Sequence, residues 1–226
     1  MEANRGSDVL SCHDALLSLA SDETEYLFYV DHHQRRSSVP SFVMSLDSAT
    51  LLIEQILVTM MTSDAEEQGE LASLFEKLQL MEPGRESQLV ENEIWEIWCH
   101  HEEPEAVDAM EQVVEALSRG SLADANEGLN RMVRRWPTWA EAWNKRATLR
   151  FVEERDLDSM EDIQRTLQLE PRHFGAISGF GQLCMRAGDV NSAVVAFERA
   201  VRLNPNFEDI RKAITYLERE LPRTLH

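Results

Sequence analysis

Apolar residues recur at helical spacing along most of the chain, and three prolines mark a longer period. Pro137, Pro171 and Pro205 stand 34 residues apart, and each closes a stretch whose apolar positions repeat in register. A proline cannot continue a helix, so each one ends a unit. A fixed period of this length indicates stacked helical hairpins, because one hairpin cannot bury its apolar side alone. The pattern therefore predicts an all-α repeat architecture.

The last period, residues 174–207, matches a known signature most closely. Gly181 and Ala193 are small where the two helices must approach, Phe180 and Phe197 are large where space must be filled, and Gly188 falls at the turn. In this register the sequence resembles the tetratricopeptide-repeat (TPR) family, with its W-x2-L-G-x2-Y…A-x3-F…A…P pattern. The matching positions are Ile177, Phe180, Gly181, Cys184, Ala193, Phe197, Ala200 and Pro205.

The two earlier periods keep this register, in residues 140–173 and, with a more degenerate sequence, in residues 106–139. After Pro205, residues 207–221 read as one more amphipathic helix, of the kind that caps a terminal repeat. The resemblance implies a right-handed superhelical TPR solenoid. We expect about three helix-turn-helix hairpins (106–139, 140–173 and 174–207) and a C-terminal capping helix in a TPR domain spanning 106–221.

Residues 46–105 form a separate, acidic segment with helical periodicity. Apolar spacing predicts helices over 45–62, 65–79 and 86–100, the second ending before Pro83 and Gly84. We expect these two or three acidic helices to pack on the first repeat, with the third shielding its open end. Residues 1–45 lack a sustained period and are predicted to be irregular or disordered, although Glu25–Val30 favours a short strand or an anchoring motif.

The charge distribution narrows the partner class. Residues 1–63 carry a net charge of −6, residues 64–118 carry −14 and residues 119–226 carry +1. A nucleic-acid backbone would be repelled by most of this chain. The acidic segment is either a set of solvated helix faces or a docking surface for a basic partner or for the arginine face of the repeats. The apolar run Leu51–Met61 is too short to span a bilayer. The three cysteines show no spacing typical of a disulfide framework, which favours a reducing, cytoplasmic location.

A narrower resemblance covers residues 86–206. Asn144–Thr148 (NKRAT), Pro171–Ala176 (PRHFGA) and the upstream run Ile94–Trp98 (IWEIW) are similar to a group of short TPR proteins that are widespread in bacteria. The resemblance implies a non-enzymatic interaction scaffold, because that group has no assigned reaction. The chain departs from it where Arg150, Glu154 and Asp156 replace aromatic and glycine residues around a repeat turn. We therefore expect a looser second hairpin.

The register also predicts a peptide-binding surface. TPR proteins bind an extended peptide or a helix in the concave groove formed by their first helices. Either a partner segment or this protein's own N-terminal segment would fill it. The sites of a carboxylate clamp hold Met110, Val114, Lys145, Gly175 and Gly179, so we expect no chaperone tail as ligand. The groove candidates are Met110 and Val114 in the first repeat, Asn144, Thr148 and Phe151 in the second, and Ser178, Gln182, Met185 and Arg186 in the third.

No catalytic or metal centre is predicted. Cys99, His100 and His101 are adjacent, but neighbouring residues on a helix point in different directions, so we expect neither a metal nor a cofactor. His173 could act as a base, yet the register brings no nucleophile near it, and we expect it to cap a helix or to pack between repeats. The favoured function is a non-enzymatic adaptor that binds a protein or peptide, with no nucleic-acid or membrane partner. The alternative is a chaperone-like assembly factor that uses its acidic helices, including Glu91, Glu93 and Glu96.

Overall fold

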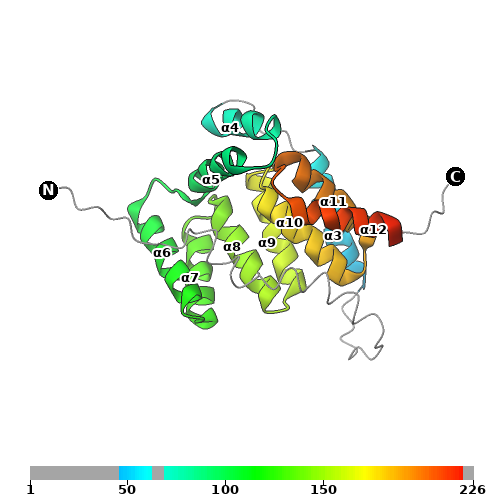
Figure 1. Ribbon diagram of the computed structural model, residues 1–226. Helices are drawn as coiled ribbons and strands as arrows, with labels where there is room; N and C mark the ends of the chain where they lie inside the picture. Colours follow the sequence, from blue (N-terminus) through cyan, green and yellow to red (C-terminus); the bar gives the residue numbers. More distant parts are fainter. Residues whose placement is uncertain (1–45, 63–68, 221–226) are drawn as a thin grey trace.

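The computed structural model describes residues 46–62 and 69–220, and every regular element in these ranges is a helix (Figure 1). The predicted irregular segment 1–45 and the predicted helix start at Ala65 lie outside the described residues. The upstream helices are α3 (Leu46–Thr62), α4 (Glu70–Gln79) and α5 (Arg85–Cys99). The remaining helices are α6 (Pro104–Ser118), α7 (Leu122–Arg135), α8 (Ala140–Val152), α9 (Asp156–Leu169), α10 (Phe174–Ala187), α11 (Val190–Leu203) and α12 (Glu208–Glu220).

The helices from α6 to α12 form the repeat array. They pair as α6 with α7, α8 with α9 and α10 with α11, and each pair packs on the next through α7 on α8 and α9 on α10. The last helix, α12, packs on α11 at the end of the array, where the sequence predicts a cap. The predicted all-α TPR solenoid of three hairpins is thus confirmed. None of the described helices combines the length and the apolar character that a bilayer span requires.

Small residues hold the paired helices close together. A Cβ atom added at Gly181 would lie 2.4 Å from the Phe197 ring, and one added at Gly128 would lie 2.7 Å from Val113. Both glycines therefore sit where only hydrogen fits between the two helices of a hairpin. At the hairpin turn, Gly188 ends α10 with a φ of 79°, in the left-handed region that favours glycine.

The second hairpin is built with charged residues at the turn and between its helices. Glu154 stands where Gly120 and Gly188 stand in the other repeats and adopts the same left-handed backbone, with a φ of 58°. Between the helices, Arg146 bonds both carboxylate oxygens of Asp162 at 2.8 Å, and Arg150 bonds one of them at 2.6 Å. Because Asp162 is buried, these bonds hold α8 firmly on α9. The expectation of a looser second hairpin is therefore wrong.

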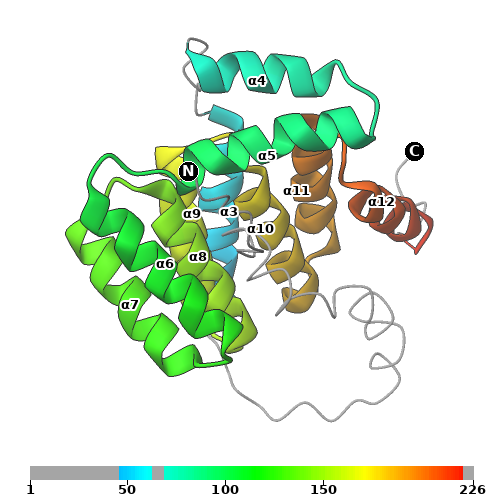
Figure 2. The same ribbon diagram turned by 60° about the vertical axis from the view of Figure 1, so that its left-hand side comes forward.

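The upstream helices lie mainly over repeats two and three, in contrast to the expected packing on the first repeat. Helix α3 packs on α9 and α11, the second helices of these repeats, and α4 packs on α5 and α11. Figure 2 shows α5 running across the ends of the repeat helices, beneath α4. The first repeat meets α5 at the C-terminal end of that helix, where the Trp139 indole N–H donates to the carbonyl of Trp98.

Two separate apolar cores result from this arrangement. The larger core joins α3, α4 and α5 to repeats two and three and to α12. The smaller core belongs to the first repeat and to one side of α8, which contributes Ala142 and Leu149. The opposite side of α8 gives Ala147 to the larger core, so α8 is the boundary between the two.

Candidate functional site

The densest group of chemically active side chains is a buried cluster around Glu141, in the first turn of α8. The Lys145 ammonium lies 2.8 Å from one carboxylate oxygen, and the His173 Nε2 atom lies 2.8 Å from the other. The Asn144 side chain donates to the same second oxygen at 3.0 Å. We call Glu141, Lys145, His173 and Asn144 the Glu141 cluster. Both Glu141 and His173 are inaccessible to solvent, with exposed fractions of 0%.

Hydrogen bonding fixes the protonation pattern of this cluster. His173 Nδ1 accepts the N–H of Ala176 and so caps α10, which leaves the ring proton on Nε2 to be donated to Glu141. Burial by itself raises the pKa of the Glu141 carboxyl, but the Lys145 ammonium and the His173 bond outweigh it and lower that pKa from 4.5 to about 2. The cluster is thus a paired carboxylate and ammonium, bridged to the next repeat by a histidine.

The two tryptophans of helix α5 pack against the Glu141 cluster on its His173 side. The Trp98 ring stacks on His173 with centroids 4.1 Å apart and planes 11° apart, and Trp95 meets His173 edge-on at 5.5 Å. Towards the N-terminal end of α5, the side chains of Ser87 and Glu91 both bond Asn206 near the end of the third repeat. Helix α5 therefore contacts the last residues of each of the three repeats, at Trp139, His173 and Asn206. It fixes their relative positions.

The arrangement is that of a structural centre. Since solvent does not reach the carboxylate or the imidazole, a substrate cannot reach them either in this conformation. The adjacent Cys99, His100 and His101 point apart: the Cys99 sulfur faces Glu141 at 4.0 Å, His100 is exposed, and His101 Nδ1 accepts the Glu103 N–H. Among the described residues, no group of three or more His, Cys, Asp or Glu side chains is arranged so that it could hold a metal ion. The predicted capping and packing role of His173 is confirmed.

The nine predicted groove residues occupy different environments. Asn144 is bonded inside the Glu141 cluster and is 7% exposed, and Met110 is 4% exposed within the smaller core. Arg186 bonds Asp156 at 2.6 Å and stacks over the Phe151 ring at 3.7 Å, so these two predicted residues join repeats two and three. The others are half-buried on the first helices of their repeats, namely Val114, Thr148, Ser178, Gln182 and Met185.

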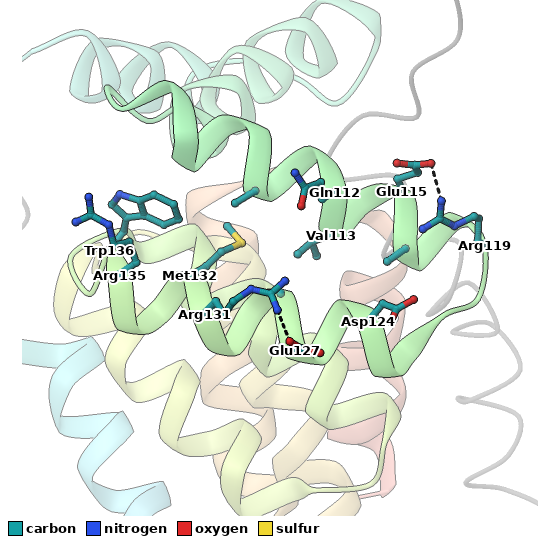
Figure 3. A pocket seen from close by; sticks show the side chains of 13 residues that line it. Gln112, Val113, Glu115, Arg119, Asp124, Glu127, Arg131, Met132, Arg135 and Trp136 are labelled. Carbon is teal, nitrogen blue, oxygen red and sulfur yellow. Dashed lines mark hydrogen bonds and ion pairs between the residues drawn. The ribbon is translucent and has the colours of Figure 1, made fainter.

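A shallow groove of about 560 Å³ lies elsewhere, between α6 and α7 at the outer end of the array (Figure 3). Its floor contains Val113 and Met132, and its rim carries the ion pairs Glu115–Arg119 and Glu127–Arg131. A terminal repeat needs such a polar outer face to remain soluble. Charged side chains of the first repeat therefore cover the open end of the array. The expectation that the helix over 86–100 shields this end is wrong.

The pairing of Glu141 with His173 was missed at the sequence level, although a signal for it was present. Trp139, His173 and Phe207 each occupy the last position of their repeats, so an aromatic ring recurs there three times. The register assigns this position to no packing site within a hairpin. A ring that recurs outside the packing sites of the register indicates an additional element lying across the array, and α5 contacts two of these rings, Trp139 and His173.

The comparison with known proteins agrees with this architecture. The chain is 27% identical over 183 residues to a TPR repeat-containing protein of Rhizobium etli, a match that covers 80% of this chain and 90% of that protein. These matched residues outnumber those from Ala106 to the end of the chain, so the similarity extends into the upstream helices. No family model matches the chain. The repeat register, the helix arrangement and this similarity agree on an all-α array of stacked helical hairpins like that of tetratricopeptide-repeat proteins.

Proposed function

We propose that the protein is a non-enzymatic adaptor that binds an extended partner segment on the first helices of repeats two and three. TPR proteins as a class bind peptides on this side of the array. The observation that carries the proposal is the extent of α5. It lies across the N-terminal ends of these helices (Figure 2), where Glu141 and Asn144 are buried, while Thr148, Ser178, Gln182 and Met185 further along are half-exposed.

The chemistry of this open half suits an uncharged segment. A hydroxyl, an amide and a thioether lie on neighbouring helices, and α8 and α10 are in direct contact. The Gln182 amide contains both a donor and an acceptor group, and Met185 has an adaptable apolar side chain. The Arg186 guanidinium at the end of α10 is bonded to Asp156 and to the Phe151 carbonyl. The surface would therefore recognise a partner segment by its backbone shape and its small apolar side chains, and an acidic tail is disfavoured as a ligand.

The test has two steps. A photo-crosslinking residue at Gln182 should capture one partner segment in the native cell, and mass spectrometry should locate the linked peptide. That peptide should then bind the purified protein saturably, and Gln182→Ala with Met185→Ala should weaken binding about tenfold or more. Gln168→Ala, on the exposed side of α9, is the matched control. Equal affinity in the double variant and the control would refute the proposal.

A second candidate is an assembly factor that docks through its acidic helices. The observation that favours it is the outward position of Glu93 and Glu96 on α5, whose other side is fixed to the repeats. Glu91 does not belong to this surface, because it is buried and bonded to Asn206. If a partner docks on this acidic surface of α5, the double variant Glu93→Gln with Glu96→Gln should associate with it more slowly and with a weaker dependence on salt concentration. Unchanged kinetics would exclude this surface.

A further inference from the structure

The final helix, α12, occupies the position of a first helix in the repeat array. The same turn precedes α8, α10 and α12, in which a backbone N–H bonds the carbonyl three residues earlier. These bonds join Trp139 to Trp136, His173 to Glu170 and Phe207 to Asn204. Each helix then packs on the second helix before it, α8 on α7, α10 on α9 and α12 on α11. Helix α12 therefore continues the row of first helices as well as capping the array.

Helix α5 contacts the chain just before each of these three helices. Trp98 accepts the Trp139 indole N–H before α8 and stacks on His173 before α10. The Ser87 hydroxyl donates to the Asn206 side chain before α12. The part of α12 that lies beyond α5 thus corresponds to the open halves of α8 and α10, which form the proposed partner surface.

The 34-residue register identifies the side chain of α12 that lies in line with this surface. Thr148 on α8 and Gln182 on α10 are 34 residues apart, and the next position in the series is Tyr216 on α12. Ala213 and Leu217 are buried on another side of α12, whereas Tyr216 has an exposed fraction of 44%. Tyrosine combines an apolar ring with a hydroxyl group and is enriched among the residues that dominate binding energy.

Two cations flank Tyr216 on the same face of α12. Lys212 precedes it by four residues and Arg219 follows it by three, and residues at these spacings are neighbours on a helix surface. Lys212 bonds Asp209 at 2.7 Å, but both side chains of this pair are about 70% exposed, so the pair is weak. This face therefore attracts an anionic group, although the chain as a whole is acidic.

We infer that a partner segment bound on α8 and α10 continues onto α12, where one carboxylate of the segment lies between Lys212 and Arg219 and an apolar side chain packs on Tyr216. The inference rests on the proposed function, because it assigns the next part of the same surface. The ligand is then uncharged where it crosses α8 and α10 and carries one negative charge where it reaches α12. An acidic side chain and a chain-terminal carboxylate both have this chemistry.

Photo-crosslinking from three positions of the full chain tests the path of the segment. Benzoylphenylalanine in place of Thr148, Gln182 or Tyr216 should capture the same partner segment. Neighbouring helices lie about 8–10 Å apart, a distance that an extended chain crosses in about three residues. The site captured from Tyr216 should therefore lie about three residues from the Gln182 site, on the side away from the Thr148 site.

The outcomes separate this inference from the proposed function. Capture from Gln182 without capture from Tyr216 would overturn the inference and leave the proposed function in place. Failure of all three positions would refute both. Benzoylphenylalanine at Gln168, on the exposed side of α9, is the control. Capture of the same segment from Gln168 would show that the crosslinks do not report a specific path and would also overturn the inference.

A synthetic copy of the captured segment tests the two cations. Lys212→Gln with Arg219→Gln should weaken its binding about tenfold and reduce the dependence of binding on salt concentration. Arg134→Gln with Arg202→Gln is the matched control, because it removes two exposed cations from the second helices α7 and α11. The control should bind within about twofold of the unaltered protein. Equal losses in the two double variants would overturn the inference.

Neutral copies of the segment identify the source of the carboxylate. In one copy the acidic residue nearest the Tyr216 crosslink is changed to its amide, and in another the C-terminus is amidated. The copy that lacks the bound carboxylate should bind the unaltered protein about tenfold more weakly. It should lose nothing further in the Lys212→Gln and Arg219→Gln double variant, because the two changes remove the same interaction. Undiminished binding of both copies would contradict the carboxylate assignment.

Discussion

The first repeat and the two later repeats share one register but are held in place differently. Repeats two and three share their core with α3, α4 and α5, and a buried charged cluster joins them to α5. The first repeat has its own smaller core and packs on α8. Polar bonds add to this contact, from Arg146 to the Asn130 side chain and from Arg165 to the Pro137 carbonyl. The repeat sequence alone therefore does not determine how firmly each repeat is held.

This difference follows from what lies outside the repeats. In a simple repeat array each unit contacts only its neighbours, and stability is a sum of similar terms. Here α5 contacts the last residues of all three repeats, but it brings its two tryptophans to the boundary of repeats two and three. The upstream helices convert that part of the array into a globular unit. The first repeat remains a terminal hairpin with a charged outer face.

The largest expected effect comes from removing the Glu141 carboxylate. Glu141→Ala leaves the Lys145 ammonium buried without its ion-pair partner, which should lower the free energy of unfolding by about 3–5 kcal/mol. Chemical denaturation measures this change. Glu127→Ala, which removes an exposed ion pair of the first repeat, should change stability by about 0.5 kcal/mol or less. Similar losses in the two variants would remove the distinction between the two regions.

The low pKa of Glu141 predicts an acid dependence. Its carboxyl titrates at about 2 when folded and near 4.5 when unfolded, so its contribution to stability is complete above about pH 5 and is lost as the pH falls towards 2. This contribution is about 3 kcal/mol. The stability difference between the unaltered protein and Glu141→Gln should shrink by that amount over this range. A difference that stays constant with pH would show that the carboxylate is not stabilised by its partners.

A smaller effect is expected at the turn of the second hairpin. Glu154 adopts a left-handed backbone that costs a residue with a Cβ atom about 1 kcal/mol, so Glu154→Gly should raise the free energy of unfolding by up to about that amount. Gly188→Ala at the equivalent turn is the opposite control and should lower it by a similar amount. Thermal unfolding would measure both changes. A loss of stability in Glu154→Gly would refute the strain at this position.

The repeat register could be predicted because each position has a local physical reason. Gly181 must be small beside Phe197, Gly188 must adopt a left-handed turn, and each proline must follow a helix end. The helices over 45–62, 86–100 and 207–221 were predicted to within a residue or so by apolar spacing. Spacing shows which side of a helix is apolar, but not which surface it meets, and this is why the packing of α3 and α5 was predicted wrongly.

The candidate site was harder to predict because burial decides what a polar residue does. Asn144 and Glu141 lie on the helix side that usually faces a ligand, and only the presence of α5 turns them into an internal cluster. Phe151 and Arg186 lie on the same side but bind each other. In both cases the competing partner comes from a distant segment, which a register of repeats does not contain.

Native-state hydrogen exchange tests the two-region account most directly. We predict that amides of α6 and α7 exchange through a partial opening with a lower free energy, while amides of α9 and α10 exchange only with global unfolding. The buried cluster and the shared core would account for the higher protection of α9 and α10. One common opening free energy from α6 to α11 would contradict the account, because it would mean that the first repeat is held as firmly as the repeats beneath α5.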